Sequence, residues 1–547
     1  MTDVQVTPNV TARRALRAPV GARAWSGRIT PKMVIVAVTT LALGLRLYYL
    51  SRPGFLFSVT EYDDGSYLGS AIRLVHGQLP YRDFVFVQPP GITLLMVPVA
   101  LVAKVTGTAW GMALGRILTV LAGTGGVAAA GLLVRRRGRL AVLIACGISA
   151  VHPESVAAAH TVLVEPWLVL CCLIGALLIF DGDRIASGRR LAWAGLTFGF
   201  AGVIESWAIV PVLVLIALSA RRPRRAAVFA GAVAAGFLIP TLPFAALAPA
   251  SFYQSVVVAQ VGRRLNATRI YSLYRIRLMT GLSDVLHPAS ALVLGVTAAI
   301  VGLVLAGTAV AWLLTRRPPA ALDWFAAATG ALMAATFLWP PQFHYHFVAF
   351  LVPFLAVSVA LSGSRLVAAL GAVSGRPDTG EALRQGVCVL VVLGIALAAV
   401  MQADYERTQQ TSLSSSEFAA IRRAIPPGGC VLADEVSDLV MADRFVSDVP
   451  DCPAIDDGTG VNYALSHGLS TATGAGRVPS VAALWRSAFA HSQFVWLSYH
   501  ASKRIPWTPW IVSYFHAHFI RIQGLGPGIS LYRRRTSRDR NESPAGG

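Results

Sequence analysis

Three acidic side chains stand close together just after the first long apolar segment of the chain: Glu61, Asp63 and Asp64. Carboxylates beside a lipid bilayer are costly unless water solvates them or they serve a function. A carboxylate can act as a general base that removes a proton from an attacking hydroxyl group. We therefore expect Asp63 and Asp64 to be catalytic. The alternative is a solvated loop with a turn at Asp64–Gly65.

The segment that carries these acids is rich in rigid and aromatic residues. Its aromatic residues are Tyr62, Tyr67, Tyr81, Phe84 and Phe86, and a Pro-Pro pair follows at 89–90. Aromatic side chains indicate a packed, ordered loop, and the two prolines would steer the chain back toward the membrane. In such a loop we expect Tyr67, Tyr81 and Gln88 to line a substrate site. Arg82 is a candidate contact for a phosphate group.

A fourth acid, Glu165, stands where another apolar segment begins, directly before Pro166. An acid at a helix N-terminus can simply offset the helix dipole. The same residue would also lie on the membrane face that carries Asp63, where the two carboxylates could form one site. Both interpretations are open at this point.

Two histidines flank a tyrosine at a later membrane boundary, in the run His344-Tyr345-His346, which follows a Pro-Pro pair. Aromatic residues are expected at a membrane interface, whereas paired histidines are less so. We expect His344 and His346 to hydrogen-bond a phosphate and Tyr345 to line the substrate. Ligation of a divalent cation is the weaker alternative, so no cofactor is predicted with certainty and the metal is unknown.

The segment 249–288 carries five arginines and one acid, Asp284, and is the one basic cluster expected on the outer face of the membrane domain. Such a cluster can contact anionic lipid headgroups without specificity, or it can bind the phosphate of a substrate. The two interpretations are compatible. Arg263 and Arg264 are the candidate phosphate ligands.

Apolar segments must position all of these residues. Of the 547 residues, 55% are hydrophobic and 14% are charged, against about 25% charged in typical soluble proteins. A membrane span needs about 20 apolar residues, and such runs recur from residue 33 to 402. They predict a mainly α fold, a polytopic membrane helix bundle of about 11 spans. The expected spans are 33–50, 111–134, 140–158, 166–180, 191–204, 205–220, 226–248, 289–315, 321–338, 345–362 and 386–402.

The placement of basic residues predicts the orientation of the bundle. The segment 1–32 is rich in arginine, and basic residues flank spans mainly on the cytoplasmic side. This rule places 1–32 in the cytoplasm as a basic tail. It also predicts that Gly91–Val105 lies on or dips into the outer face, because later basic clusters then face the cytoplasm. The net charge of +20 is thereby mostly an orientation signal, which excludes nucleic acid as a partner.

The pattern changes after residue 402. A capping box precedes an expected helix at 418–425, and short apolar runs at 430–433, 494–498 and 529–532 indicate strands. We expect an extracytoplasmic α/β domain over 403–535 and a disordered tail over 536–547. Cys430 and Cys452 both lie in this domain, where an oxidising compartment would allow a disulfide. The other cysteines, in the spans, are expected to be apolar packing residues.

The order and membrane side of these motifs resemble the GT-C superfamily of polytopic glycosyltransferases. The nearest pattern is that of protein O-mannosyltransferases and bacterial aminoarabinose lipid A transferases. In that group an Asp-Glu pair followed by x-x-Tyr opens the first outer loop. The run Asp63-Asp64-Gly65-Ser66-Tyr67 fits this pattern, except that Asp64 stands where the family has Glu. Later motifs match at Pro89-Pro90, Arg116, Glu165 and 343–346. The resemblance covers roughly residues 40–360.

One departure concerns the donor phosphate. The aminoarabinose transferases carry a lysine before the Pro-Pro pair, where it contacts this phosphate, whereas Gln88 stands at that position here. The resemblance therefore requires another source of positive charge. Arg82 or the pair Arg263 and Arg264 are the candidates.

The resemblance implies a transmembrane catalytic domain over 33–402 that moves a sugar, with inversion, from a polyprenyl-phosphate donor on the outer face. Asp63 would be the general base, and Glu165 would orient the acceptor or hold a metal ion. The implied acceptor is a cell-envelope glycan, lipoglycan or protein.

The composition suggests a host and therefore a sugar. Basic residues that are almost all arginine, together with abundant alanine, indicate a GC-rich bacterial genome and a bacterial plasma membrane. Envelopes of such bacteria favour mannose as the sugar, with arabinose next. The alternatives to a transferase are a transporter or flippase of lipid-linked sugars, and a non-enzymatic scaffold that displays the C-terminal domain.

Overall fold

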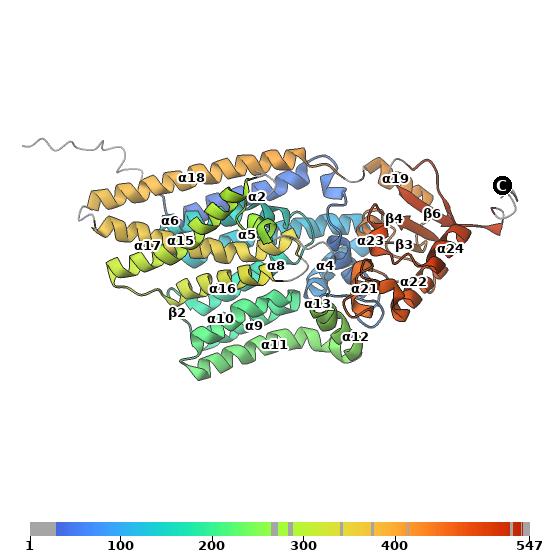
Figure 1. Cartoon of the computed structure of the whole chain (residues 1–547), viewed down its shortest axis with the longest axis horizontal. Coiled ribbons are helices and arrows are strands. Elements are labelled where there is room, and N and C mark those ends of the chain that lie inside the picture. Colours follow the sequence, from blue (N-terminus) through green and yellow to red (C-terminus); the bar gives the residue numbers. More distant parts are fainter. Residues whose placement is uncertain are drawn as a thin grey trace, which may run out of the picture.

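The computed structural model of the chain is mainly helical, as predicted, and is long in one direction (Figure 1). It describes residues 29–263, 272–282, 288–339, 343–373, 377–411, 413, 415–525, 529–537 and 539. A helical bundle occupies one end of the molecule, and the C-terminal part of the chain occupies the other. The hairpin of β1 (Phe180–Asp181) and β2 (Arg184–Ile185) lies at the far end of the bundle, which we call the distal end.

Within the described residues, seven helices are long and apolar enough to cross a membrane. Their bounds are α2 (Pro31–Ser51), α5 (Thr108–Val134), α11 (Pro223–Leu247), α15 (Ser290–Thr315), α16 (Ala321–Leu338), α17 (Val348–Val373) and α18 (Pro377–Thr408). Helices α15 and α18 bury little of their surface inside the protein. Their apolar side chains therefore fit a lipid environment, in which an all-round apolar helix is stable.

Shorter apolar helices complete the bundle. They are α4 (Gly91–Thr106), α6 (Arg139–Val151), α8 (Glu165–Ile179), α9 (Arg189–Ile204) and α10 (Ile209–Ser219), with the turn η3 (Ser206–Ala208) before α10. The single helix expected over 140–158 is wrong: α6 ends at Val151 and a separate short helix, α7 (Pro153–Ala157), follows. Proline favours the first turn of a helix and interrupts a helix that reaches it, which explains the break. The number of spans stays a prediction.

Helices α9 and α11 pack closely because glycines line their contact. A Cβ atom on Gly199 would lie 2.2 Å from the carbonyl oxygen of Val233, and one on Gly236 would lie 2.3 Å from that of Leu196. Small residues four apart allow such a close approach between helices in membranes. Gly195 and Gly199 provide this spacing on α9.

The first outer loop is largely helical. The turn η1 (Phe55–Phe57) leads to α3, a helix of 13 residues that runs from Asp63 to Val75. The alternative of a solvated turn at Asp64–Gly65 is therefore wrong, because both residues lie in the first turn of α3 and are buried. The two aspartates stabilise this end of the helix through its dipole.

A series of short helices follows α11: α12 (Pro249–Tyr253), the π-helical turn η4 (Gln254–Val258), α13 (Ala259–Val261) and α14 (Ser272–Met279). The turn η4 and α13 contact α21 (Gly458–Leu465) of the C-terminal part, whereas α14 contacts α15, α16 and α17 of the bundle. The Gln254 amide donates a hydrogen bond to the Ala464 carbonyl, at 2.5 Å. Arg264 and Asp284 lie outside the described residues.

The C-terminal part builds a four-stranded sheet with helices around it. The strands are β3 (Val431–Ala433), β4 (Phe494–Leu497), β5 (Phe519–Arg521) and β6 (Ser530–Arg534), in the order β3-β4-β6-β5. Strands β3 and β4 are parallel, and the other two pairs are antiparallel. The helices are α19 (Ser415–Ala424), α20 (Val436–Met441), α21 (Gly458–Leu465), α22 (Pro479–His491), α23 (Ala501–Arg504) and α24 (Pro509–His518), with the turn η6 (Ala475–Arg477). The domain bounds 403–535 stay a prediction.

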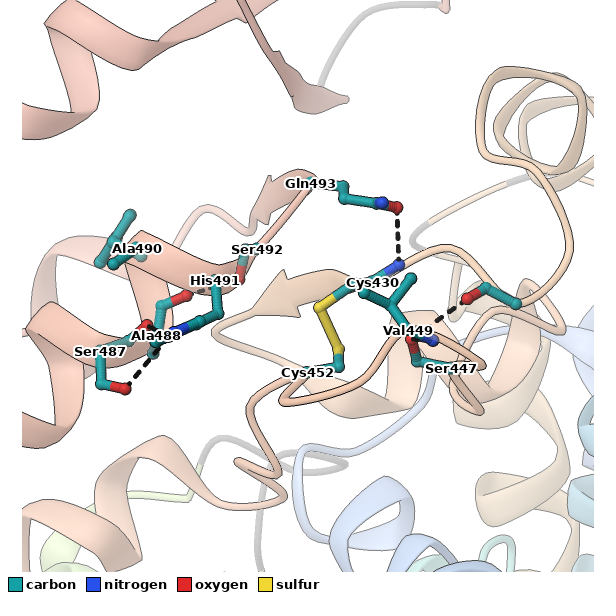
Figure 2. The surroundings of a disulfide bond; sticks show 12 residues. Cys430, Ser447, Val449, Cys452, Ser487, Ala488, Ala490, His491, Ser492 and Gln493 are labelled. Carbon is teal, nitrogen blue, oxygen red and sulfur yellow. Dashed lines mark hydrogen bonds between the residues drawn. A yellow bond between two sulfur atoms is a disulfide. The ribbon is translucent and has the colours of Figure 1, made fainter.

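A disulfide joins Cys430, just before β3, to Cys452 in the loop after α20 (Figure 2). The two Cα atoms lie 5.5 Å apart. The Cys430 backbone N–H donates to the side-chain oxygen of Gln493, at 3.3 Å, which ties the disulfide to the start of β4. The disulfide therefore anchors the loop that leads to α21.

Candidate active site

A cavity of about 320 Å³ lies where the helical bundle meets the C-terminal part. Five acids and two arginines are among the residues that line it: Glu61, Asp63, Glu165, Glu205, Asp457, Arg263 and Arg504. Such a dense collection of ionisable groups in one hollow is typical of a catalytic site.

Asp63, His346 and Glu165 form a chain of polar groups along one wall of this cavity. The His346 Nδ1–H donates to Glu165 Oε1, at 2.6 Å, and His346 Nε2 lies 3.8 Å from Asp63 Oδ2. The Asp63 side chain is 27% exposed, whereas those of His346 and Glu165 are almost fully buried. Of these three side chains, Asp63 is thus the one that a substrate can reach.

The helix ends place these three side chains. Asp63 is the first residue of α3, and Glu165 is the first residue of α8, with Pro166 in the next position. His346 lies in η5 (Tyr345–Phe347), the turn that leads into α17. Because three elements end at one point, residues nearly 300 positions apart share one wall.

Burial raises the pKa of Asp63 to about 7. His346 and Arg263 lower this pKa through their positive charge, whereas the negative charges of Glu61 and Asp457 raise it. A carboxylate with a pKa near neutrality is suited to accept a proton during catalysis.

Three buried polar atoms at the cavity have no hydrogen-bond partner among the described residues: Gln88 Oε1, Glu165 Oε2 and His346 Nε2. All three side chains line the cavity. Unpaired buried polar groups are costly, so these atoms are suited to bind polar groups of a substrate.

Glu205 lies at the break between α9 and α10. Its carboxylate accepts a hydrogen bond from the Ser206 backbone N–H, at 2.9 Å, and thereby caps the turn η3. The same side chain lines the cavity. The helix break therefore brings a further acid to the site.

Asp64 points away from the cavity, unlike its neighbour Asp63. Its Oδ2 accepts a hydrogen bond from Arg116 Nη2, at 3.1 Å, and its Oδ1 accepts one from Ser437 Oγ, at 2.6 Å. Both members of the Asp64–Arg116 pair are fully buried. This geometry gives Asp64 a structural role that joins α3, α5 and α20.

The C-terminal part contributes Asp457 and Arg504 to the cavity, and neither is among the residues predicted from the sequence. The Tyr62 hydroxyl donates to Asp457 Oδ1, at 2.8 Å, and the Arg504 guanidinium stacks 4.0 Å from the centre of the Tyr62 ring. Arg504 also donates to Glu435 Oε2, at 2.6 Å. No local motif surrounds these two residues, so only the fold reveals them.

The remaining candidates divide between the cavity and its surroundings. Gln88, Tyr67, His344 and Arg263 line the cavity, and the Arg263 guanidinium lies 5.1 Å from the centre of the Tyr463 ring.

Three candidates lie outside the cavity lining. The Tyr81 hydroxyl donates to the Gln88 carbonyl, at 2.6 Å, and the Tyr345 hydroxyl donates to Glu61 Oε2, at 2.9 Å. Both tyrosines therefore position residues that do line the cavity. Arg82 is half exposed and pairs with Asp83, at 2.8 Å, which removes it from the site.

No group of three or more His, Cys, Asp and Glu side chains in the described part of the chain is arranged to hold a metal ion. The expected alternative of a divalent cation at His344 and His346 thus gains no further ligands from these residues.

Comparisons with known proteins point to one fold. Residues 86–336 match the model of glycosyltransferase family 87. ArnT from Cupriavidus metallidurans in the apo state is 13% identical, with a TM-score of 0.56 over 94% of this chain and 98% of that chain. The same protein bound to undecaprenyl phosphate is 12% identical, with a TM-score of 0.56 over 92% of this chain and 98% of that one.

A third solved structure is the oligosaccharyltransferase of Archaeoglobus fulgidus in complex with Zn and sulfate. It is 12% identical, with a TM-score of 0.50 over 92% of this chain and 73% of that chain. No curated protein sequence matches the chain significantly. The fold and the apolar helices are those of a multi-pass membrane protein, and the predicted resemblance to the GT-C superfamily of glycosyltransferases is confirmed.

Proposed function

We propose that the protein is a membrane glycosyltransferase that moves a sugar from a polyprenyl-phosphate donor to a hydroxyl group of an acceptor. The observation that carries this proposal is the Asp63 carboxylate, which is reachable in the cavity and whose pKa is raised to about 7. The match to glycosyltransferase family 87 supports the reaction class. The structural likeness to a protein crystallised with undecaprenyl phosphate supports the donor class.

In this reaction Asp63 acts as the general base. The acceptor oxygen attacks the anomeric carbon, its proton passes to an Asp63 oxygen, and a new glycosidic bond forms. The bond from the anomeric carbon to the phosphate oxygen breaks in the same step. Polyprenyl phosphate leaves with the bonding electrons, so the configuration of the sugar is inverted.

Two arginines are placed to stabilise the leaving group. Arg263 and Arg504 line the cavity on the sides of α13 and of the C-terminal part, respectively. Negative charge accumulates on the phosphate as the bond breaks, and fixed positive charges stabilise that transition state more than the ground state. In this proposal Arg263 and Arg504 provide the positive charge that was predicted from the sequence to come from Arg82, or from Arg263 with Arg264.

Glu165 and His346 position the reacting groups. Their hydrogen bond holds the imidazole beside Asp63, and their unpaired atoms offer an acceptor and a second polar contact to substrate hydroxyls. An oriented acceptor reacts faster because the entropy of bringing it to the donor is already lost on binding.

The composition of the chain supports a narrower proposal for the substrates. We infer mannose as the sugar, with arabinose next, and a cell-envelope glycan, lipoglycan or protein as the acceptor. The arginine-rich, alanine-rich composition favours a bacterial plasma membrane. The basic clusters favour a cytoplasmic N-terminus, with the cavity and the C-terminal part on the outer face.

Transfer from a radiolabelled polyprenyl-phosphate sugar by the purified full-length protein tests the proposal. Mannosyl and arabinosyl donors are tested in parallel. A membrane extract supplies the acceptor in both assays, and the radioactivity of the product is measured. The Asp63→Asn variant should lose transfer by about 10²–10⁴-fold while it still binds the donor. Asp83→Asn is the matched control, because Asp83 is an acid of the same loop that lies outside the cavity. Equal turnover by the two variants would remove Asp63 from the role of base.

A further inference from the structure

A second polar cavity lies at the distal end of the bundle, far from the candidate active site. Its volume is about 780 Å³. The β1–β2 hairpin, the start of α9, the end of α10 and the start of α11 all contribute to its lining. The proposed reaction uses none of these residues.

The charge of this cavity is strongly positive. Its two acids are already engaged, because Asp181 bonds to Arg136, at 3.3 Å, and Asp183 bonds to Arg137, at 2.7 Å. Four arginines of the lining have no acidic partner among the described residues: Arg184, Arg221, Arg222 and Arg225. Their charge is therefore available to a ligand.

The backbone and one hydroxyl group add to this anion preference. Helix α9 begins at the cavity, and no side chain caps its first N–H groups. Uncapped N–H groups at the start of a helix bind phosphate readily. Helix α11 also begins there, but its first residue, Pro223, has no N–H, and the Arg225 N–H already donates to the Arg222 carbonyl, at 2.8 Å. Ser219, at the end of α10, also lines the cavity, and its buried hydroxyl has no hydrogen-bond partner among the described residues.

The positive-inside rule explains why arginines are found at the distal end, but this rule requires only that they lie somewhere near that end of the bundle. It does not explain why the end of one helix and the beginnings of two others enclose a hollow with an unpaired buried hydroxyl. A bound anion would account for both features, since guanidinium groups bind phosphate oxygens in pairs.

We propose that the distal cavity binds a phosphate group, supplied either by inorganic phosphate or by the headgroup of an anionic phospholipid. The ligand bridges Arg221 of the α10–α11 connection, Arg225 of the first turn of α11 and Arg184 of the hairpin. This inference is independent of the proposed transfer reaction, because it concerns the opposite end of the bundle and is measured by binding.

Binding is tested with full-length protein purified in a neutral detergent. One arm measures the shift of the thermal unfolding temperature on addition of inorganic phosphate, because a ligand of the native state raises that temperature. The other arm measures, by native mass spectrometry, how much phosphatidylglycerol or phosphatidylcholine the protein retains after mixing with each lipid. The double variant R221Q/R225Q is compared with R316Q/R317Q, which removes the same charge from two exposed arginines that follow α15.

We expect R221Q/R225Q to weaken binding at least about tenfold, because two charge-assisted contacts are lost, and R316Q/R317Q to bind like the natural protein. A shift with inorganic phosphate identifies phosphate itself as a sufficient ligand. Preferential retention of phosphatidylglycerol without such a shift identifies the lipid headgroup.

Equal binding by the two double variants, or no binding of either probe by the natural protein, would overturn the proposal. The Cys430–Cys452 disulfide, checked under non-reducing conditions, reports that each variant is folded and correctly oriented. If R221Q/R225Q does not fold, R184Q replaces it, because Arg184 is an exposed residue of the hairpin. Undiminished binding by R184Q would then count against the proposal.

Discussion

Asp63 stands between groups that act on its carboxylate in opposite directions. His346 and Arg263 favour the charged form, while burial and the neighbouring acids Glu61 and Asp457 favour the protonated form. The balance leaves its pKa at about 7. A base of this strength is half charged at neutral pH, and it can also release the proton it receives. Each neighbour is therefore a means to tune the reaction.

We expect the pH profile of transfer to report this balance. A general base must be deprotonated, so kcat/KM should rise with pH through about 7 in the natural protein. His346→Asn removes a positive charge that lowers the pKa of Asp63, so its profile should move to higher pH. Glu61→Gln removes a negative charge that raises this pKa, so its profile should move to lower pH.

The measurement is the initial rate of sugar transfer across a pH series at low donor concentration. Asp83→Asn, outside the cavity, serves as the control and should keep the natural profile. Shifts in the same direction for both variants would show that Asp63 is not the titrating group.

The sequence could predict the residues that share a membrane boundary, and it could not predict those that the fold brings in from afar. Asp63, Glu165 and His346 stand at the ends of apolar runs, where an ionisable residue is conspicuous. Asp457 and Arg504 lie in a polar segment, where acids and arginines are ordinary. Their contacts with Tyr62, about 400 positions earlier in the chain, and their place in the cavity lining show that they belong to the site.

At the scale of elements, helices α9 and α11 illustrate how small residues set the geometry of the bundle. The backbone of Val233 lies against Gly199 so closely that no side chain fits between them. The position of α9 in turn fixes Glu205, the first residue after its end. Packing in the bundle thereby determines where one acid of the cavity stands.

We expect Gly199→Ala to destabilise the protein by about 1–3 kcal/mol, because the added methyl group forces two backbones apart. Gly231→Ala, on α11, is the matched control. A Cβ atom there meets nothing within 4 Å, and alanine favours a helix more than glycine does. The thermal unfolding temperature, measured in detergent, should therefore fall for Gly199→Ala only. Equal unfolding temperatures would show that α9 and α11 do not pack as described.

Elements whose residues form one continuous apolar run could be predicted from the sequence. Elements that mix polar, apolar and glycine residues could not. The expected runs at 111–134, 166–180 and 494–498 correspond to α5, α8 and β4 with small shifts at their ends. The sequence predicts only a packed, ordered loop where α3 forms. Glycines at 65 and 69 and serines at 66 and 70 give this segment a low helix propensity. Tertiary contacts override that preference: a Cβ atom on Gly65 would lie 2.3 Å from the backbone nitrogen of Ser437.

At the scale of the whole molecule, the cavity has walls from both ends of the chain. Asp63 and Glu165 belong to the bundle, whereas Asp457 and Arg504 belong to the C-terminal part. The site therefore depends on how the C-terminal part is held. The disulfide lies five residues before Asp457 and constrains the loop that leads to it.

We expect the double variant C430S/C452S to lose both stability and transfer activity. The bond closes a loop of 22 residues, and a loop of about that length contributes about 3 kcal/mol to the stability of a folded domain. Limited proteolysis measures the temperature at which the C-terminal part unfolds, and this temperature should be lower in C430S/C452S than in the natural protein. Cys146→Ser is the control, because Cys146 is a free cysteine of the bundle. A proteolysis profile shared by both variants would show that the disulfide does not hold the site.

The buried pair of Asp64 and Arg116 bears on the order in which the protein is made. Ser437 completes the hydrogen bonds of Asp64, and Ser437 is synthesised long after the bundle. Until Ser437 has been synthesised, the Asp64 carboxylate therefore lacks one of its hydrogen-bond donors. The cavity likewise lacks Asp457 and Arg504 until the C-terminal part has been made. The cavity is therefore complete only when the last quarter of the chain has folded against the bundle, and we expect a chain that ends before Asp457 to lack transfer activity.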